Sequence, residues 1–335
     1  MSKYSIILPV HNGGHYLKQC IDSILSQTYT DFNCIILENA STDGTLEWLQ
    51  SVRDDRIMII SSNKLLTIEE NWGRITGVKK NEFITLIGHD DILYPDFLDV
   101  MNRQVTSKPE ASLYHTHFNY IDASGNITRP CKPMSPSITG NEFLQAFLTG
   151  SIDSMGTGYV MRSADYDALQ GIPLKYPNLL FADFELWLNL TFKGYEVVAP
   201  EKCFAFRIHK STTGTALDKK LHKALDLFID FLSSLENRDA QAKEIINEYG
   251  VPFLMFYCKG FSNRLLRTPF YKREKLTVRD FIEHTKKLAA KLGIQDKYRP
   301  ENVSSVKLAA FIDSNIVSRK LFLLFKRIYP KPISR

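Results

Sequence analysis

The fold is decided by residues 4–40, which read YSIILPVHNGGHYLKQCIDSILSQTYTDFNCIILENA. The apolar, β-branched run at 4–10 predicts a buried strand, and apolar residues then recur at helical spacing from Leu17 to Leu25. A second run of the same kind at 32–40 predicts another strand. This succession of strand, helix and strand is typical of two parallel strands joined by a helix.

The alternation continues along the chain. Further strands are predicted at 56–62 and 82–88, with a helix at about 69–80 between them. Strands that alternate with helices indicate a parallel sheet covered on both faces. The turn at 122–126 then predicts a hairpin over 112–128, and hence an antiparallel extension of the sheet. The later elements are expected as a helix at 140–149, a strand at 158–163, a helix at 181–193 and a strand at 196–209.

Charge divides the chain near Thr215. Residues 1–215 carry 18 Lys and Arg against 24 Asp and Glu, a net charge of −6, whereas residues 216–335 carry 24 against 13, a net charge of +11. The second part has helical patterning almost throughout. We therefore expect an α/β domain at 1–215 and a basic, mostly helical region at 216–335.

Several features favour a protein of the cytoplasm. No apolar run approaches the roughly 20 residues that cross a bilayer, and the first ten residues, MSKYSIILPV, lack the pattern of a secretory signal. The five cysteines are scattered, without the CxxC spacing of a metal site. We expect these thiols to be reduced and mostly buried.

Polar residues follow the predicted strands at their carboxyl ends, where open α/β sheets bind ligands. Asp90 and Asp91 come directly after the apolar strand at 82–88. Adjacent carboxylates repel each other unless water or a cation separates them, and Mg²⁺ and Mn²⁺ bind one or two carboxylates together with phosphate oxygens. The pair alone predicts either such a cation site or a solvated turn whose acid caps the next helix.

The glycine-rich motifs GxGxxG and GxxxxGK[ST] do not occur in the sequence, which removes the main signal for a dinucleotide or P-loop site. Six other segments stand in a specific order: SIILPVHNGGHYLKQCIDSILSQTYTDF, IILENASTDGT, EENWGRITG, FITLIGHDDIL, FADFELWLNL and FRIHKSTT. Together they resemble the inverting glycosyltransferases of family 2 over residues 4–215. The resemblance implies the GT-A fold, a Rossmann-like mixed sheet with helices on both faces, and a nucleotide-sugar donor.

The resemblance assigns the donor's base and ribose to two strand ends. Pro9, Val10, His11 and Asn12 match the segment that lines the base and ribose, and Glu38 stands where the family usually has the aspartate that holds them. Because glutamate is one methylene longer, a preference for uridine is expected to be less strict. Without the resemblance, Glu38 would be interpreted as an exposed acid at a strand end.

Two further segments match elements around the sugar diphosphate. Asn71 and Arg74 match an element that borders the nucleotide-sugar, although Arg74 also suits a solvated helix face and Trp72, between them, suits a helix core. The family's Asp-x-Asp metal motif falls on residues 88–90, so Gly88 replaces its first aspartate. This leaves Asp90 as the expected ligand of Mn²⁺ or Mg²⁺. His89 is expected near the ribose or sugar, and Asp91 as a support of the metal site or a partner of a sugar hydroxyl.

Asp183, in FADFELW, matches the family's catalytic base, which takes the proton of the acceptor hydroxyl. Glu185, two residues on, points away from it on a helix and is expected at the surface or at the acceptor. His209 matches a residue that closes over the diphosphate and can approach the metal, with Arg207 and Lys210 as neighbouring phosphate contacts. A single histidine at a strand end is otherwise structural.

The sequence from Ser304 onward combines apolar residues on one side of a predicted helix with seven basic residues and one acid, Asp313. Such a helix either lies on an anionic membrane surface or packs its apolar face on the catalytic domain. Charge alone also suits an acidic acceptor, nucleic acid or a solvated helix face. We expect no nucleic-acid partner.

The resemblance therefore implies a metal-dependent enzyme that moves a hexose or N-acetylhexosamine from a UDP-sugar, with inversion. The implied acceptor is a saccharide or lipid-linked saccharide of cell-surface polysaccharide synthesis, which places the enzyme in the cytoplasm or on the inner face of the membrane. The alternative is a non-catalytic nucleotide-sugar-binding or scaffold protein on the same fold. Gly88 and Glu38, which depart from the family pattern, favour this alternative.

Overall fold

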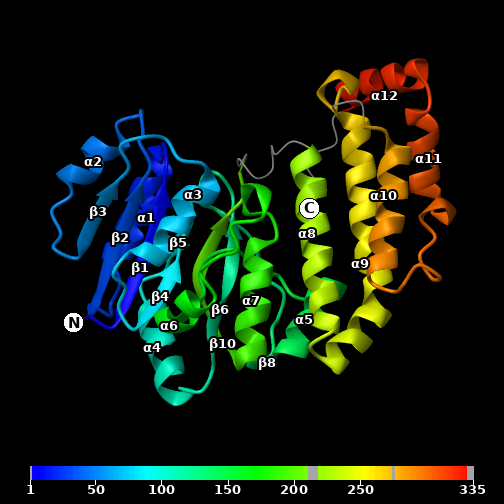
Figure 1. The fold of residues 1–335 in the computed structure, drawn as a ribbon. Coiled ribbons are helices and arrows are strands. Elements are labelled where there is room, and N and C mark those ends of the chain that lie inside the picture. The colour runs from blue at the N-terminus through cyan, green and yellow to red at the C-terminus, as the bar shows by residue number, and fades with distance from the viewer. Residues whose placement is uncertain (1, 210–217, 274–275, 330–335) are drawn as a thin grey trace. The chain divides into compact units, whose positions relative to one another are not determined.

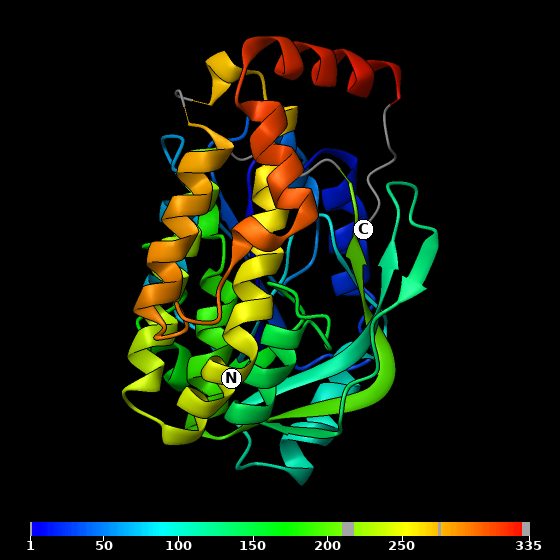
Figure 2. The same ribbon diagram turned by 90° about the vertical axis from the view of Figure 1, so that its right-hand side faces the viewer.

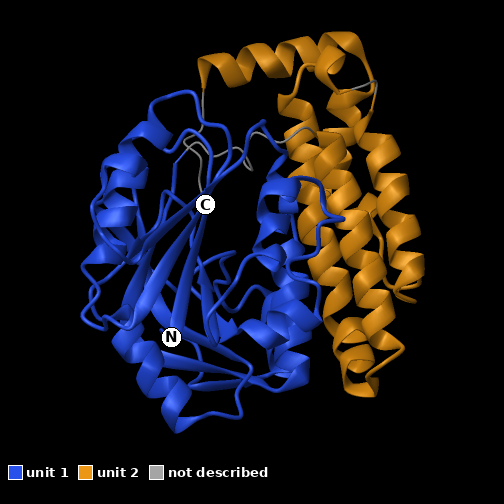
Figure 3. Ribbon diagram, turned by 60° about the vertical axis from the view of Figure 1, so that its left-hand side comes forward, with its two compact units in different colours: residues 1–215 blue, residues 216–335 orange. Residues whose placement is uncertain are grey.

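A computed structural model of the chain describes residues 2–209, 218–273 and 276–329. The chain divides into two compact units, residues 1–215 and residues 216–335 (Figure 3). Unit 1 contains the sheet, and every helix of unit 2 follows it in sequence (Figure 1).

Unit 1 is built on one mixed sheet, to which the described residues contribute ten strands. They are β1 (Tyr4–Val10), β2 (Phe32–Glu38), β3 (Ile57–Ser61), β4 (Phe83–Leu86), β5 (Ile92–Leu93), β6 (Leu113–Ile121), β7 (Ile127–Pro130), β8 (Ser137–Thr139), β9 (Val160–Arg162) and β10 (Tyr195–Arg207). The main order is β3-β2-β1-β4-β9-β6-β10-β5, with β7 paired to β6 and β8 to β10. The first four strands are parallel, whereas β9 runs antiparallel to both β4 and β6. The predicted α/β class with a mixed sheet is confirmed.

The predicted hairpin is also present, because β6 and β7 pair antiparallel around a turn closed by Asp122. The helices of unit 1 are α1 (Gly14–Leu25), α2 (Thr45–Ser51), α3 (Ile68–Gly73), α4 (Phe97–Ser107), α5 (Gly140–Thr149), α6 (Ser163–Ala168) and α7 (Ala182–Lys193), with 3₁₀ turns η1 (Arg74–Gly77) and η2 (Pro177–Leu179). The predicted helix at 69–80 is therefore wrong in length. Gly73 and Gly77 are poor helix formers, and the α-helical part ends at the first of them.

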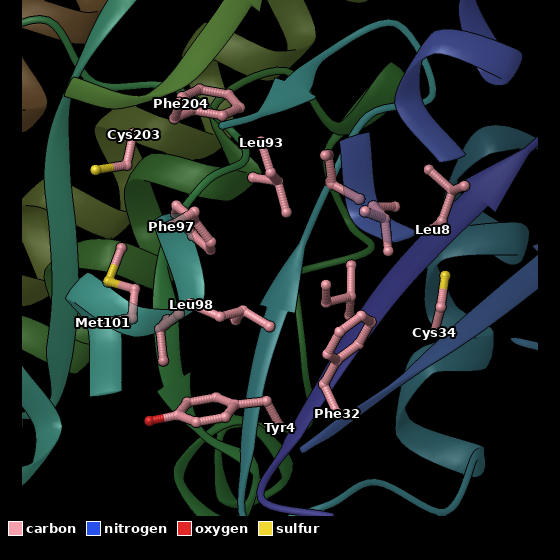
Figure 4. Packing of buried hydrophobic residues seen from close by; sticks show 14 of the residues in the cluster. Tyr4, Leu8, Phe32, Cys34, Leu93, Phe97, Leu98, Met101, Cys203 and Phe204 are labelled. Atoms are coloured by element: carbon pink, nitrogen blue, oxygen red, sulfur yellow. The ribbon is translucent and has the colours of Figure 1, made fainter. Parts of the chain in front are cut away.

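The core of unit 1 explains why the sheet needs helices on both faces. Tyr4, Ile6, Leu8 and Val10 are fully buried in one hydrophobic cluster with residues of α1 and α4 (Figure 4). Ile7, which points to the opposite face because strand residues alternate, is fully buried as well. A strand that is apolar on both faces is stable only inside such a layered fold.

Unit 2 consists of helices. They are α8 (Asp218–Glu236), α9 (Ala240–Arg267), α10 (Val278–Lys291), α11 (Ser304–Asp313) and α12 (Ile316–Ile328), with 3₁₀ turns η3 (Phe270–Lys272) and η4 (Pro300–Asn302). The long helix α9 packs against α8, α10 and α11. The single basic helix expected from Ser304 is wrong, because Asn315 starts a new helix by accepting a hydrogen bond from Ser318 N at 2.9 Å. Figure 2 shows α12, in red, turned away from the axis of α11.

Candidate active site

Unit 1 contains a cavity of about 530 Å³ at the carboxyl ends of its strands. Its wall is formed by the loop after β4, the loop before β9, the start of α7, the end of β10 and part of α3. The lining residues are Ile68, Trp72, Gly88, Asp90, Asp91, Gly156, Thr157, Ile172, Asn178, Leu179, Leu180, Phe181, Asp183, Phe184, Phe206, Arg207, Ile208 and His209. Three predicted functional groups, Asp90, His209 and Asp183, thus share one cavity although the sequence separates them widely.

Asp90 and His209, the two predicted metal ligands, face each other directly. His209 Nε2 lies 2.6 Å from Asp90 Oδ2, and both side chains are partly exposed. Among the residues with described positions, no third His, Cys, Asp or Glu completes a metal cluster with them. One carboxylate oxygen and one imidazole nitrogen fit a Mn²⁺ or Mg²⁺ ion that takes its other ligands from phosphate and water.

Gly88 stands where the family motif has its first aspartate, and it lies close to the two carboxylates that follow it. A Cβ atom at this position would lie 2.7 Å from Asp90 Oδ1 and 3.2 Å from Asp91 Oδ2. Both contacts are too close for the present positions of these carboxylates. A side chain at position 88 would therefore require the Asp90 carboxylate to move.

Asp91 has a supporting position beneath Asp90. It is buried, and its two oxygens accept hydrogen bonds from Thr157 Oγ1 at 2.7 Å and from Arg207 N at 3.0 Å. Burial, followed by the negative charge of Asp90, raises its pKa well above the usual value. Asp91 thereby joins the loop after β4 to β10 and to the loop before β9.

Arg207 connects the same loop to the rest of unit 1. Its buried guanidinium donates to Asp90 O at 2.7 Å, Gln19 Oε1 at 2.7 Å and Asp122 O at 3.2 Å. These donors are directed at protein oxygens, and Arg207 also lines the cavity, so its contact with a phosphate stays a prediction. The guanidinium also lies over the ring of Tyr16, 4.6 Å from its centre.

Tyr16 is a site residue that the sequence analysis missed. Its ring contacts the imidazole of His209, with the ring centres 5.0 Å apart, and also the guanidinium of Arg207. Tyr16 lies on α1, and only its place in the first turn of a helix after a strand end could have indicated this position.

Asp183 lies in the first turn of α7, at the wall of the cavity. Burial raises its pKa from the usual 3.8 to about 6, against the lowering effect of backbone hydrogen bonds from Phe184 and its own amide. Phe181 and Phe184 line the cavity beside it. A carboxylate with this pKa is ionised at neutral pH and can accept a proton.

Gly156 and Thr157 form the part of the wall next to Asp183 and Asp91. A Cβ at Gly156 would lie 3.3 Å from Asp183 Oδ2, so glycine keeps the space in front of this carboxylate open. From the sequence alone, Gly156 and Gly158 would be interpreted as turn residues. No motif marked Thr157, whose role depends on a tertiary contact.

Glu38 is fully buried at the end of β2, so its alternative interpretation as an exposed acid is wrong. Oε1 accepts a hydrogen bond from Ser41 N at 2.6 Å, whereas Oε2 is buried and accepts no hydrogen bond from any described residue. A buried carboxylate oxygen without a donor is costly and suits a ligand that brings one.

The loops after β1 and β2 are tied together. Asn12 N donates to Ser41 Oγ at 3.0 Å, Thr42 N donates to Asn12 Oδ1 at 2.8 Å, and His11 Nδ1 lies 2.9 Å from Asn39 O. Pro9 and Val10 differ from these polar residues because both are buried within β1, and Val10 belongs to the hydrophobic cluster. Their side chains therefore face protein, and only their backbone is left to line a base.

Asn71 and Arg74 donate hydrogen bonds to backbone oxygens at the ends of β2 and β3. Arg74 donates to Glu38 O and to Asn71 Oδ1, both at 2.9 Å, and also to Ile60 O. Asn71 is buried and donates to Leu37 O at 3.3 Å. Arg74 thus lies on neither a solvated face nor the wall of the cavity. Trp72 is partly exposed and lines the cavity, so its interpretation as helix core is wrong.

Two other residues singled out in the sequence, His89 and Glu185, do not line the cavity. His89 is partly exposed and does not line the cavity, and burial lowers its pKa. Glu185 is buried rather than at the surface, where Lys175 Nζ donates to it at 2.9 Å and the Tyr176 hydroxyl also donates. Lys210 lies outside the described residues.

Comparison with known proteins is consistent with this geometry. Residues 5–167 match the sequence profile of glycosyl transferase family 2. The chain is 34% identical over 253 residues to the uncharacterized glycosyltransferase RT0329 of Rickettsia typhi, a match that covers 70% of this chain and 73% of that protein. It is 26% identical over 239 residues to the UDP-Glc:alpha-D-GlcNAc-diphosphoundecaprenol beta-1,3-glucosyltransferase WfgD of Escherichia coli, covering 69% of this chain and 87% of that protein.

Other relatives are longer than the matched region. The chain is 27% identical over 125 residues to glycosyltransferase GlyG of Streptococcus pneumoniae, which is 37% of this chain and 42% of that protein. This chain therefore spans less than half the length of that relative.

Two solved structures share the fold. TarS 1-349 of S. aureus, in complex with UDP, superposes with a TM-score of 0.63 at 12% identity, covering 99% of this chain and 93% of that one. The mannosyltransferase PcManGT of Pyrobaculum calidifontis, in complex with GDP-Man and Mn²⁺, gives a TM-score of 0.52 at 11% identity. The match covers 99% of this chain and 88% of that one. The chain therefore belongs to glycosyl transferase family 2 and has the GT-A fold.

Proposed function

We propose that this glycosyltransferase moves a hexose or N-acetylhexosamine from a UDP-sugar to a saccharide acceptor with inversion at the anomeric carbon. The observation that carries the proposal is the position of Asp183, a carboxylate with a raised pKa in the wall of the same cavity as Asp90 and His209. An inverting transfer needs a base on one side of the anomeric carbon and a leaving diphosphate on the other.

In the proposed reaction, Asp183 accepts the proton of the acceptor hydroxyl. The oxygen of that hydroxyl forms a bond to the anomeric carbon while the bond from this carbon to the diphosphate oxygen breaks. The electron pair of the broken bond leaves with the nucleoside diphosphate. Gly156 supports this role because it leaves room in front of the Asp183 carboxylate.

Asp90 and His209 would hold a divalent cation, Mn²⁺ or Mg²⁺, when the donor is bound. The cation would neutralise negative charge that develops on the leaving diphosphate. Asp91, Arg207 and Tyr16 hold Asp90 and His209 in position through the hydrogen bonds and the ring contact described above. Lys210, next to His209 in sequence, remains a proposed phosphate contact.

The nucleoside would bind at the ends of β1 and β2. Glu38 supports this because its Oε2 atom lacks a donor that a base or ribose can supply. His11 and Asn12 lie on the adjoining loop, and His89 at the end of β4 is a further proposed contact to the ribose or sugar. The UDP named for the relative WfgD and for the TarS complex supports uridine over other bases.

The acceptor class follows from the same relative. WfgD is named for transfer to a GlcNAc-diphosphoundecaprenol, which supports a lipid-linked saccharide of cell-surface polysaccharide synthesis as the acceptor here. The enzyme would then work in the cytoplasm at the inner face of the membrane. The described helices include none that is both long and apolar enough to span a bilayer.

The proposal is tested with purified protein, a panel of UDP-, dTDP- and GDP-sugars, Mn²⁺ and saccharide acceptors, by measuring release of the nucleoside diphosphate. Asp183→Asn should still bind the donor in a thermal-shift assay but should lose at least about a hundredfold in transfer rate. Transfer by this variant at the parental rate would show that Asp183 is not the base. Donor binding without release across the whole panel would favour the non-catalytic alternative, which Gly88 and the internal engagement of Arg207 support.

A further inference from the structure

Helix α12 carries an apolar stripe on its outer face. Val317, Leu321, Leu324 and Ile328 follow each other at intervals of four, three and four residues, which places them on one side of a helix. Their exposed fractions are 65%, 61%, 55% and 61%. Four large aliphatic side chains in line, each more than half exposed, are unusual on a surface that only water covers.

The opposite face of α12 contacts other helices of unit 2. Arg319, Phe322, Leu323 and Lys326 are all only partly exposed, and α12 contacts α9 and α11. None of the described side chains of α12 is buried, so the helix contributes little to a core. The stripe therefore does not serve the packing of unit 2.

Basic residues border the stripe, and the segment offers them no exposed acid. Lys320 and Arg327 are exposed next to it. Asp313, the sole acidic residue from Ser304 to Arg335 in the sequence, is buried. Its carboxylate accepts from Arg273 Nη1 at 2.7 Å and lies 3.0 Å from Arg319 Nε, so it is already neutralised inside unit 2.

We propose that α12 is an interfacial helix that binds the surface of a bilayer rich in anionic lipids. The stripe would enter the boundary between headgroups and acyl chains, and Lys320 and Arg327 would lie among the lipid phosphates. Charge complementarity selects an anionic surface over a neutral one. With its 13 residues, α12 extends about 20 Å, which suits a position parallel to the membrane plane.

The binding does not depend on the proposed catalysis. Its benefit rests on the proposed function, because a surface-bound enzyme meets a lipid-linked acceptor more often than one in solution. Membrane binding by α12 and the proposed sugar transfer can therefore be disproved independently, since lipid binding is measured without donor or acceptor.

The test is co-sedimentation of the full chain with vesicles of phosphatidylcholine containing about one third phosphatidylglycerol, compared with pure phosphatidylcholine. The chain should partition preferentially to the anionic vesicles and should lose binding as salt is raised. Leu321→Gln with Leu324→Gln, and separately Lys320→Gln with Arg327→Gln, should each lower the partition coefficient by about tenfold or more.

The matched control removes two charges from elsewhere in unit 2, by Lys259→Gln and Lys287→Gln on the exposed sides of α9 and α10. This variant should bind vesicles within about twofold of the parent. Because the stripe residues are exposed, their glutamine variants should keep the parental thermal unfolding and should transfer sugar to a soluble acceptor at the parental rate.

Three results would overturn the proposal: equal partitioning of the stripe variant and the parent, equal binding to neutral and anionic vesicles, or a change from oligomer to monomer in the stripe variant. The last result, measured by light scattering, would assign the stripe to contact between copies of this chain.

Discussion

Glu69 on α3 accepts a hydrogen bond from the backbone N of Asn178 through Oε1, at 2.7 Å. This bond joins the helix beside the proposed nucleotide site to the segment that precedes Asp183. In that segment Asn178, Leu179 and Phe181 have φ angles of 55°, 55° and 70°. Asparagine tolerates the left-handed region, whereas it is unfavourable for Leu179 and Phe181 by roughly 1–2 kcal/mol each, so the segment needs outside contacts to keep its shape.

Loss of this bond should affect the acceptor side of the reaction. Glu69→Ala removes one hydrogen bond, worth about 1 kcal/mol, and we expect KM for the acceptor to rise about fivefold while KM for the donor stays the same. Glu69→Gln keeps a carbonyl acceptor and should restore most of the parental KM. Initial rates at varied acceptor and donor concentrations measure both constants. Glu47→Gln, on the exposed side of α2, is the control, and a rise in donor KM alone for Glu69→Ala would contradict the expectation.

The pH dependence of transfer should reflect Asp183. Its pKa is raised to about 6 by burial, so the carboxylate is ionised above this pH and protonated below it. The rate of transfer should therefore rise with pH, reach half its maximum near pH 6 and level off above it. Rates measured from pH 5 to pH 8 in one mixed buffer test this, and a half-maximum near pH 4 would mean that burial does not perturb the base.

The raised pKa of Asp183 also predicts an effect of pH on the stability of the fold. Because the folded state binds this proton more tightly than the unfolded state, ionisation of Asp183 destabilises the fold as pH rises from about 4 through about 6, and the cost persists at neutral pH. Asp183→Asn should therefore melt at the parental temperature or above it at pH 7.5. The difference from the parent should vanish at pH 4, and a lower melting temperature at pH 7.5 would contradict it.

Metal binding should require both the donor and Asp90. Two protein ligands are few for a divalent cation, so Mn²⁺ alone should hardly change the melting temperature, whereas Mn²⁺ together with UDP should raise it. Asp90→Asn should abolish the extra stabilisation by Mn²⁺, and His209→Ala should weaken it. Thermal-shift titrations of Mn²⁺ with and without UDP measure these effects. Equal stabilisation of the parent and Asp90→Asn would assign the cation to other ligands.

A methyl group at Gly156 should reduce transfer without preventing donor binding. Its Cβ would lie 3.3 Å from Asp183 Oδ2 and crowd the space proposed for the acceptor hydroxyl. For Gly156→Ala we expect kcat/KM for the acceptor to fall between about tenfold and a hundredfold. Gly260→Ala on α9 is the control, since a Cβ there meets no heavy atom within 4 Å, and it should leave transfer unchanged. A parental rate for Gly156→Ala would place the acceptor elsewhere.

The buried ion pair of unit 2 should matter for stability. Asp313→Asn leaves the buried Arg273 guanidinium without its counter-charge and should destabilise the protein by about 3–5 kcal/mol in urea unfolding followed by circular dichroism. Asp230→Asn, which breaks an exposed pair with Lys291, should cost no more than about 1 kcal/mol. Equal effects of the two variants would contradict the role assigned to Asp313.

The sequence predicted most of the fold, because strand and helix patterns are local. The runs at 4–10 and 32–38 form β1 and β2, and the turn around Asp122 closes the expected hairpin. It failed over the length of two helices, since Gly73, a poor helix former, ends the α-helical part of α3 and Asn315 starts a new helix as its N-cap. It also expected Glu185 at the surface or at the acceptor, since no local pattern shows that Lys175 and Tyr176 bind it in a buried position.

By itself, the sequence determined the order of the strands and helices, the family and the short list of polar residues at the strand ends. Only the tertiary structure decided which of these residues meet. His209 and Asp90, 119 positions apart, face each other because β10, which ends just before His209, pairs with β5, which begins just after Asp91. The guanidinium groups of Arg207, which lines the cavity, and of Arg74 donate to protein oxygens, and Asp91 accepts from Thr157 and the Arg207 amide. The physical reason is that hydrogen bonding and burial depend on neighbours in space, which a local pattern of residues does not contain.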